Sequence, residues 1–346
     1  MAAPRTVQPQ VEVVWEASEL AVPSVTARLA VRTCAPQQLA VRAQVVVAGA
    51  IGVPQTFYTA FAQWLAQLGF AVTTFDYRGH AASQRGPLRK NKANLLDWAV
   101  DCQAVAQHVR ERAPQLPLYW VGHSVGAQLP GMSDPPLPID GLLCIASGSG
   151  YWRDNAPPTR RKVLLWWHVI APIVTALCGC MPGKRWGLVG NLPAGVIWQW
   201  RRWCMHPRYA IGVEGQLLYD AYASARYPLH AMSVEDDEMM SWHSTRSLMG
   251  WYRNAPQTME RVRMQDVPQR RIGHFGFFRS EMAPHLWPRA LHVLERWLVQ
   301  GHSARGNPEV APWAQCSDPQ TARVQGQARQ AHNADNGQGE LFTEVP

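Results

Sequence analysis

The first third of the chain alternates short apolar runs with longer segments whose apolar side chains recur at helical intervals. Residues 44–48 are almost all valine, a composition typical of a strand covered on both faces. Residues 56–68 carry apolar side chains at helical spacing, and Gly69 ends that segment. A second apolar run at residues 70–75 follows, so this part of the chain predicts one strand-helix-strand unit.

The same alternation continues further along the chain. The pattern predicts a helix over about residues 94–112 and strands at 118–121, 141–146 and 229–234. Two earlier β-like runs, 11–15 and 26–32, predict an antiparallel hairpin that leads into the sheet. Short connections between alternating strands and helices indicate an α/β protein with a mostly parallel central sheet and helices on both faces.

The alternation stops between residues 148 and 227, where many tryptophans are mixed with arginine and proline. We interpret this segment as a helical cap inserted between an N-terminal core half, residues 1–147, and a C-terminal core part, residues 228–300. Its stretch 163–180 has nearly the length of a membrane span, but a cap helix explains it more simply than a stable membrane span. Residues 301–346 have few large apolar groups, so we expect a disordered tail. The cap tryptophans are Trp152, Trp166, Trp167, Trp186, Trp198, Trp200 and Trp203.

Composition narrows the class of protein and its partners. The 346 residues are 47% hydrophobic and 17% charged, which fits a globular protein with a large core. The net charge of +8 comes mainly from arginine, and no nucleic-acid-binding module accompanies it. The basic surface could attract anionic substrates or lipid head groups, which leaves peripheral membrane contact open. The sequence does not determine the oligomeric state.

The seven cysteines show neither a disulfide framework nor a zinc-site pattern. Only Cys178 and Cys180 lie close together, and a single Cys-X-Cys is poor evidence for a metal site. Residues 1–10 contain no apolar stretch of signal-peptide length. We therefore expect reduced thiols, a cytoplasmic location and no metal or organic cofactor.

The most informative chemical motif is Gly-X-Ser-X-Gly at residues 122–126, directly after the strand predicted at 118–121. A serine raised on a sharp strand-to-helix turn needs small neighbours two positions away, because larger side chains would collide where the backbone reverses. Gly122 and Gly126 meet that requirement. The motif therefore nominates Ser124 as a nucleophile.

A nucleophilic serine needs a base and an acid, and both follow in the order serine, acid, histidine. His274 is the candidate base because it lies in a glycine-flanked loop before the final helix. For the acid, Asp237 follows the strand at 229–234, and Asp236 is the alternative. We expect Glu235 and Glu238, in the same acidic run, to be solvated.

Stabilisation of an oxyanion requires two backbone N–H groups close to the nucleophile. Val125 should supply one donor, and Ala50 or Ile51, in the turn after strand 44–48, should supply the other. Asp76 and Arg78 precede the nucleophile in the chain, so we interpret them as a structural turn pair.

Together these segments resemble the bacterial α/β-hydrolase superfamily, and more narrowly its uncharacterised "predicted α/β hydrolase" group. The resemblance covers residues 40–300 and rests on residues 48–55, 76–79, 122–126, 148–152, 236–238 and 271–278. It implies an α/β-hydrolase fold and a triad of Ser124, Asp237 and His274. The chain departs from the usual pattern at Ala127, at the proline-rich segment 130–138 and at Val234.

We therefore expect a serine hydrolase that cleaves an ester or thioester of a small to medium apolar acyl group, most simply a carboxylic ester hydrolase. In this scheme Ser124 attacks, His274 transfers the proton and Asp237 orients the imidazole. An acyltransferase would use the same three residues. A non-catalytic binding or scaffold protein on this fold is the third alternative.

Overall fold

An eight-stranded sheet organises the computed structural model, which describes residues 11–23, 25–186 and 190–300. The tail predicted at residues 301–346 lies outside the described residues. The strand order is β1-β2-β4-β3-β5-β6-β9-β10, with β2 antiparallel to both β1 and β4 and the pairs from β4 to β10 parallel. The strands are β1 (Val13–Ala21), β2 (Arg28–Pro36), β3 (Ala43–Ala48), β4 (Phe70–Phe75), β5 (Leu118–His123), β6 (Gly141–Ile145), β9 (Leu229–Val234) and β10 (Gln257–Val262).

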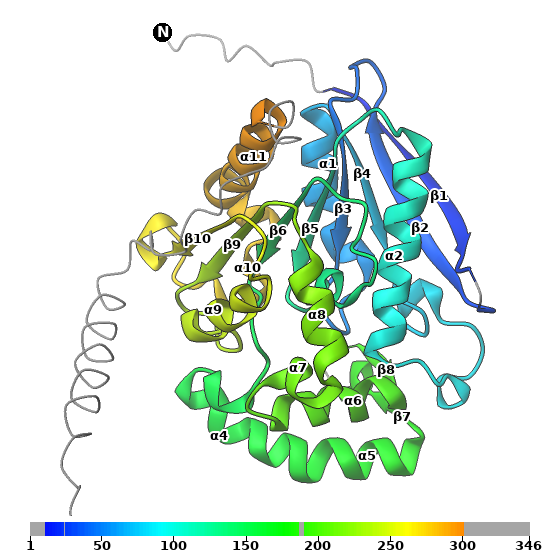
Figure 1. Ribbon diagram of the computed structural model, residues 1–346, viewed down its shortest axis with the longest axis vertical. Coiled ribbons are helices and arrows are strands. Elements are labelled where there is room, and N and C mark those ends of the chain that lie inside the picture. Colours follow the sequence, from blue (N-terminus) through cyan, green and yellow to red (C-terminus); the bar gives the residue numbers. More distant parts are fainter. Residues whose placement is uncertain (1–10, 24, 187–189, 301–346) are drawn as a thin grey trace, which may run out of the picture. The chain divides into compact units, whose positions relative to one another are not determined.

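Helices cover both faces of this sheet (Figure 1). The core helices are α1 (Thr59–Gln67), α2 (Leu95–Arg112), α3 (Val125–Gln128), α9 (Trp242–Trp251), α10 (Gly273–Gly276) and α11 (Ala283–Gln300). Strand β3 shows how the faces are filled: Val46 and Ala48 join the apolar cluster that contains α2, while Val45 and Val47 join the cluster of α1 and α11. Because successive side chains on a strand point to opposite faces, an all-apolar β3 is buried on both sides.

The cap follows β6 and consists mainly of helices. It contains α4 (Pro157–Leu165), a π-helical turn (Trp166–Ile170), α5 (Ala171–Cys178), the short strands β7 (Cys180–Pro182) and β8 (Asn191–Pro193), α6 (Ala194–Met205), α7 (Tyr209–Glu214) and α8 (Gln216–Ser224). Among the described residues, only the continuous helix Thr159–Cys178 is long and apolar enough to cross a membrane by length and composition. Its Trp167, Ala171 and Val174 are buried in the apolar core, and 17% of its most apolar window is buried inside the molecule.

The predicted fold class is confirmed, and so is the N-terminal antiparallel hairpin. Outside residues 148–227, helix α9 and the edge strand β10 were not predicted. Strand β10 pairs only with β9 and is half-exposed, so its sequence lacks the continuous apolar run of the central strands. His274 was expected in a loop but lies on the one-turn helix α10.

The predicted pairing of Asp76 with Arg78 is wrong. Asp76 accepts hydrogen bonds from the backbone and side-chain amides of Gln55, at 2.8 and 3.0 Å, and so anchors the end of the turn after β3. Arg78 instead binds the fully buried Asp101 of α2, with Nε to Oδ1 at 2.7 Å. Burial outweighs the guanidinium and raises the pKa of Asp101 to about 6.

Candidate active site

Ser124 lies at the sharp turn between β5 and α3, in the conformation that the glycine spacing predicts. Its φ of 54° and ψ of −118° are unusual for a residue with a Cβ and persist only where the surroundings hold them. A Cβ on Gly122 would lie 2.4 Å from the Ala127 Cα, and one on Gly126 would lie 2.2 Å from the Ala48 carbonyl oxygen. Both positions therefore require glycine.

Two hydrogen bonds from neighbouring segments fix this turn. The Ser124 N–H donates to the Ile145 carbonyl at 3.0 Å, and the Ser147 hydroxyl donates to the Ser124 carbonyl at 2.7 Å. Ala127, noted above as a departure from the pattern, is fully buried and leaves the turn intact. The departure at Ala127 does not disrupt the elbow.

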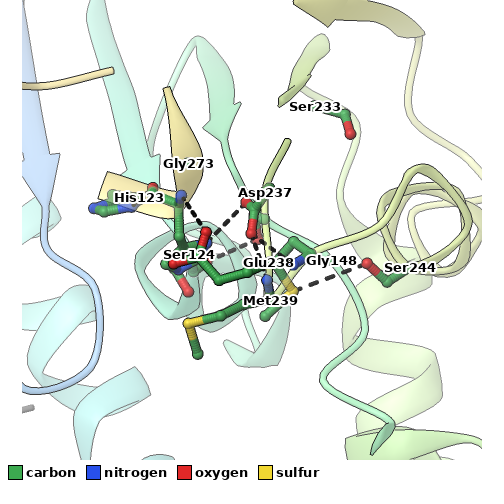
Figure 2. Close-up of polar contacts among 12 residues, drawn as sticks. His123, Ser124, Gly148, Ser233, Asp237, Glu238, Met239, Ser244 and Gly273 are labelled. Carbon is green, nitrogen blue, oxygen red and sulfur yellow. Dashed lines mark hydrogen bonds and ion pairs between the residues drawn. The ribbon is translucent and has the colours of Figure 1, made fainter. Parts of the chain in front are cut away.

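Asp237 and His274 form a buried pair, and Figure 2 shows Asp237 in the same region as Ser124 and Gly273, the residue before His274. Asp237 Oδ2 lies 2.8 Å from His274 Nδ1, and the two side chains are at most 1% exposed. The other oxygen, Oδ1, accepts the backbone N–H groups of Met239 and Met240 at 2.7 and 2.8 Å. This arrangement fixes the carboxylate against Nδ1, so that Nε2 is the ring nitrogen the carboxylate does not engage.

Two of the neighbouring acidic residues, Asp236 and Glu238, bind the backbone of the histidine segment. Asp236 accepts the N–H groups of Gly273 at 2.9 Å and Ile272 at 3.0 Å. Glu238 accepts the His274 N–H at 3.3 Å and pairs with Arg271 at 3.0 Å. Glu235 accepts the Met264 N–H at 2.8 Å. Glu235 is exposed as expected, although it also accepts this bond, whereas Glu238 is only partly exposed and is paired. The geometry favours Asp237 over Asp236 as the partner of His274.

His123, the residue before the nucleophile, belongs to a buried hydrogen-bonded chain that the sequence did not reveal. Its Nδ1 lies 2.8 Å from the Tyr58 hydroxyl, and its Nε2 lies 3.0 Å from the His274 carbonyl oxygen. The Tyr58 oxygen also accepts the Ala50 N–H at 2.8 Å. Since a carbonyl only accepts, Nε2 carries the proton, and Nδ1 accepts from Tyr58.

The protonation states of this chain follow from its burial. Burial, and secondly the nearby His274, lower the pKa of His123 well below its usual value, so its imidazole is neutral near pH 7. Burial likewise raises the pKa of Tyr58, which keeps its phenol protonated. These hydrogen bonds therefore connect the turn after β3 to the histidine segment through neutral, fully paired side chains.

The hydrogen bond between Ala50 and Tyr58 also changes the prediction for the oxyanion hole. Ala50 is unsuitable as a donor because its N–H already donates to Tyr58. Ile51 remains the candidate in that turn, and Val125, at the first position of α3, has an N–H that a helix leaves without an intrahelical acceptor. Gly126 packs against Ala48 and Gly49, which holds the two donor segments together.

Residues 40–266 match the family described as serine aminopeptidase, S33, a span of more than half the chain. The chain belongs to this α/β-hydrolase family. The S33 chain has no significant sequence match among curated proteins.

Solved structures share its fold at low sequence identity. A soluble variant of monoglyceride lipase from Saccharomyces cerevisiae, in complex with a substrate analogue, is 16% identical with a TM-score of 0.60, over 86% of this chain and 98% of that one. An esterase from Pyrococcus furiosus is 14% identical with a TM-score of 0.55, over 85% and 97%. A peroxisomal α/β-hydrolase from Saccharomyces cerevisiae is 11% identical with a TM-score of 0.54, over 97% and 99%. These structures show that the chain has the α/β-hydrolase fold, and its assignment to the serine aminopeptidase, S33, family rests on the family match.

An apolar cavity of about 180 Å³ lies between the acidic turn and the cap. Met239 and Met240, whose N–H groups bind Asp237, form one wall. The cap forms the opposite wall through the π-helical turn and α6. The remaining lining residues are Gly150, Asn155, Thr159, Val163, Trp166, Trp167, Trp200 and Cys204.

Sequence reasoning missed Tyr58, His123, Met239 and Met240 as parts of this site. His123 was visible in the motif, but its partners lie 65 and 151 residues away, and no local pattern identifies them. The sequence pointed to apolar cap residues only through the abundance of tryptophan. Among the described residues no group of three or more His, Cys, Asp or Glu side chains is arranged to hold a metal.

Proposed function

We propose that the chain is a serine hydrolase that cleaves esters or thioesters of a small to medium apolar acyl group. The observation that carries the proposal is the buried Asp237–His274 pair at 2.8 Å, found together with Ser124 held at φ 54° on the turn after β5. A strained serine, an oriented imidazole and a buried carboxylate are the groups that acyl transfer requires, in the required chain order.

In the proposed reaction the Ser124 hydroxyl attacks the substrate carbonyl carbon while Nε2 of His274 takes its proton. The Val125 and Ile51 N–H groups bind the oxyanion of the tetrahedral intermediate. Its collapse breaks the bond to the alkoxide or thiolate leaving group, which receives the proton from His274. Water activated by the same imidazole then hydrolyses the acyl-serine ester and restores Ser124.

The cavity supports an apolar acyl group of limited length. An apolar cavity of about 150 Å³ accommodates benzene, so the cavity of about 180 Å³ suits an acyl group of about six or seven carbon atoms. Its lining contains no carboxylate to pair with a substrate ammonium group, which favours esters over peptides with a free amino terminus. The free thiols of the described cysteines agree with the proposed cytoplasmic location.

A fluorophosphonate probe tests the nucleophile directly. We expect the wild type and Ser247→Ala to be labelled, and Ser124→Ala and His274→Ala to remain unlabelled. Ser247 is a suitable control because its hydroxyl bonds only to the His243 carbonyl, at 3.1 Å. Absence of labelling in a folded wild type would exclude the proposal.

A series of p-nitrophenyl esters, from acetate to decanoate, then tests the acyl site. We expect kcat/KM to peak near hexanoate, because longer chains exceed the cavity. A preference for acetate or decanoate would contradict the assignment of the cavity without affecting that of Ser124.

A further inference from the structure

The outer face of the cap helix Thr159–Cys178 is apolar where solvent-facing helices are usually polar. Leu165, Val169, Ile173 and Leu177 follow one another at intervals of four residues and are 56%, 42%, 53% and 82% exposed. We call these four residues the apolar ridge. A π-helical turn at Trp166–Ile170 widens the helix there, which helps a four-residue spacing to stay on one face.

The arginines and lysine of this helix lie before the ridge, at its N-terminal end. Residues 163–178 contain no Asp, Glu, Lys or Arg. The opposite face is packed, because Trp167, Ala171 and Val174 are buried in the cap. Figure 1 shows α4 and α5 end to end at the outer edge of the cap, with α6 and α7 on their inner side. The ridge is therefore an unpartnered apolar face and not part of the core.

Positive charge is concentrated in the segment that carries the ridge, and cations lie at both of its ends. Residues 148–227 hold ten Arg and Lys against three Asp and Glu, a net +7 of the chain's +8. Arg160, Arg161 and Lys162 are exposed at one end of the ridge. Arg89, Lys184 and Arg185 are exposed at the other end, where Arg89 packs against Gly179. Among the described residues, none of these six cations forms a salt bridge.

We propose that the apolar ridge docks this protein on the surface of an anionic lipid bilayer, with the flanking arginines and lysines at the head groups. An apolar helix face with cations at its ends is typical of helices that lie in the membrane interface. A second copy of the chain is the less suitable occupant, because it would bring two surfaces of the same positive sign together. The buried inner face argues against insertion across the bilayer.

Docking would also orient the cavity. The inner face of the same helix contributes Val163, Trp166 and Trp167 to the cavity lining. This last consequence rests on the proposed function, since it gives an apolar acyl group a short path from lipid to the cavity. The docking itself requires no reaction at Ser124.

Sedimentation with vesicles tests the docking, using Ser124→Ala so that the lipids stay intact. We expect binding to vesicles of phosphatidylcholine and phosphatidylglycerol in equal amounts, and much weaker binding to pure phosphatidylcholine or at high salt. Replacing Leu165, Ile173 and Leu177 by serine should reduce the partition coefficient by at least about tenfold. Replacing Arg160, Arg161 and Lys162 by glutamine should weaken binding to the anionic vesicles alone.

The matched control replaces three exposed apolar side chains that lie outside the cap. Val14, Val100 and Val299 are 52%, 47% and 82% exposed, and their replacement by serine should leave vesicle binding unchanged. Circular dichroism establishes that each variant is folded. The proposal is overturned if the wild-type surface does not bind anionic vesicles at low salt, or if the ridge variant binds as well as its parent. A dimer that the ridge variant dissociates, with no vesicle binding by either protein, also overturns it in favour of a second copy.

Discussion

Replacing Asp237 by asparagine should leave the site intact and remove the correct imidazole tautomer. In the native site Asp237 Oδ1 accepts two N–H groups, from Met239 and Met240, while Oδ2 faces Nδ1 of His274. Those two donors would hold the asparagine carbonyl oxygen on their side, so its NH₂ would point at Nδ1. Nδ1 must then accept, the proton moves to Nε2, and the base can no longer accept from Ser124. A wrong tautomer of this kind lowers kcat by about 10⁴ in a serine hydrolase.

The assay is kcat for p-nitrophenyl hexanoate, with urea unfolding to confirm stability. Asp236→Asn is the matched control, since Asp236 binds only the Ile272 and Gly273 N–H groups. It should lose one charge-assisted hydrogen bond and about 2 kcal/mol of unfolding free energy, with a much smaller loss of kcat. If folded Asp236→Asn loses more activity than Asp237→Asn, Asp236 is the acid and the tautomer argument is wrong.

Three further predictions concern the turn, the buried histidine and the cavity. Gly126→Ala should cost about 3 kcal/mol of unfolding free energy because its Cβ would lie 2.2 Å from the Ala48 carbonyl, whereas Gly250→Ala, with open space around it, should be tolerated in urea unfolding. Because the folded pKa of His123 lies below its usual 6.5, the unfolded chain binds more protons under acid conditions. Stability should therefore fall as pH drops below 6.5, by up to about 1.4 kcal/mol per pH unit from this residue, and His123→Gln should show a shallower urea-midpoint dependence on pH. Trp200→Ala should move the ester optimum to longer chains, whereas Trp198→Ala, outside the cavity lining, should not; an unchanged optimum in both would refute the cavity assignment.

The central sheet was predictable because its strands are buried on both faces, and because the helices that cover it repeat apolar residues at helical intervals. Strand β3 illustrates this, since every one of its residues is buried and nearly every one is apolar. The edge strand β10 escaped prediction because solvent covers much of it and no continuous apolar run marks it. Burial, and not strand geometry itself, carries the signal that a single sequence offers.

The predicted site depended on residue types at fixed local spacing, which is why Ser124 could be nominated from its two glycines. The role of His123 could not be inferred, because the orientation of its ring depends on hydrogen bonds to Tyr58 and to the His274 carbonyl. The misassignment of Ala50 has the same origin. Its N–H is in the expected turn, but a tyrosine eight residues later occupies it. A donor's position can be read from local sequence, whereas its availability depends on tertiary contacts.

The acidic run after β9, residues 235–238, shows both what the local sequence reveals and what only the tertiary structure reveals. Sequence placed four carboxylates in one turn and left two as candidates for the triad, since nothing local distinguishes consecutive aspartates. In the structure, three consecutive carboxylates bind different parts of the segment around His274. Asp236 binds the backbone before His274, Asp237 binds the His274 ring, and Glu238 binds the His274 N–H. Because the target lies 36 or 37 residues away, the division of labour appears only in three dimensions. It also explains why the run is so acidic: positioning one imidazole through both its ring and its backbone takes more than one acceptor.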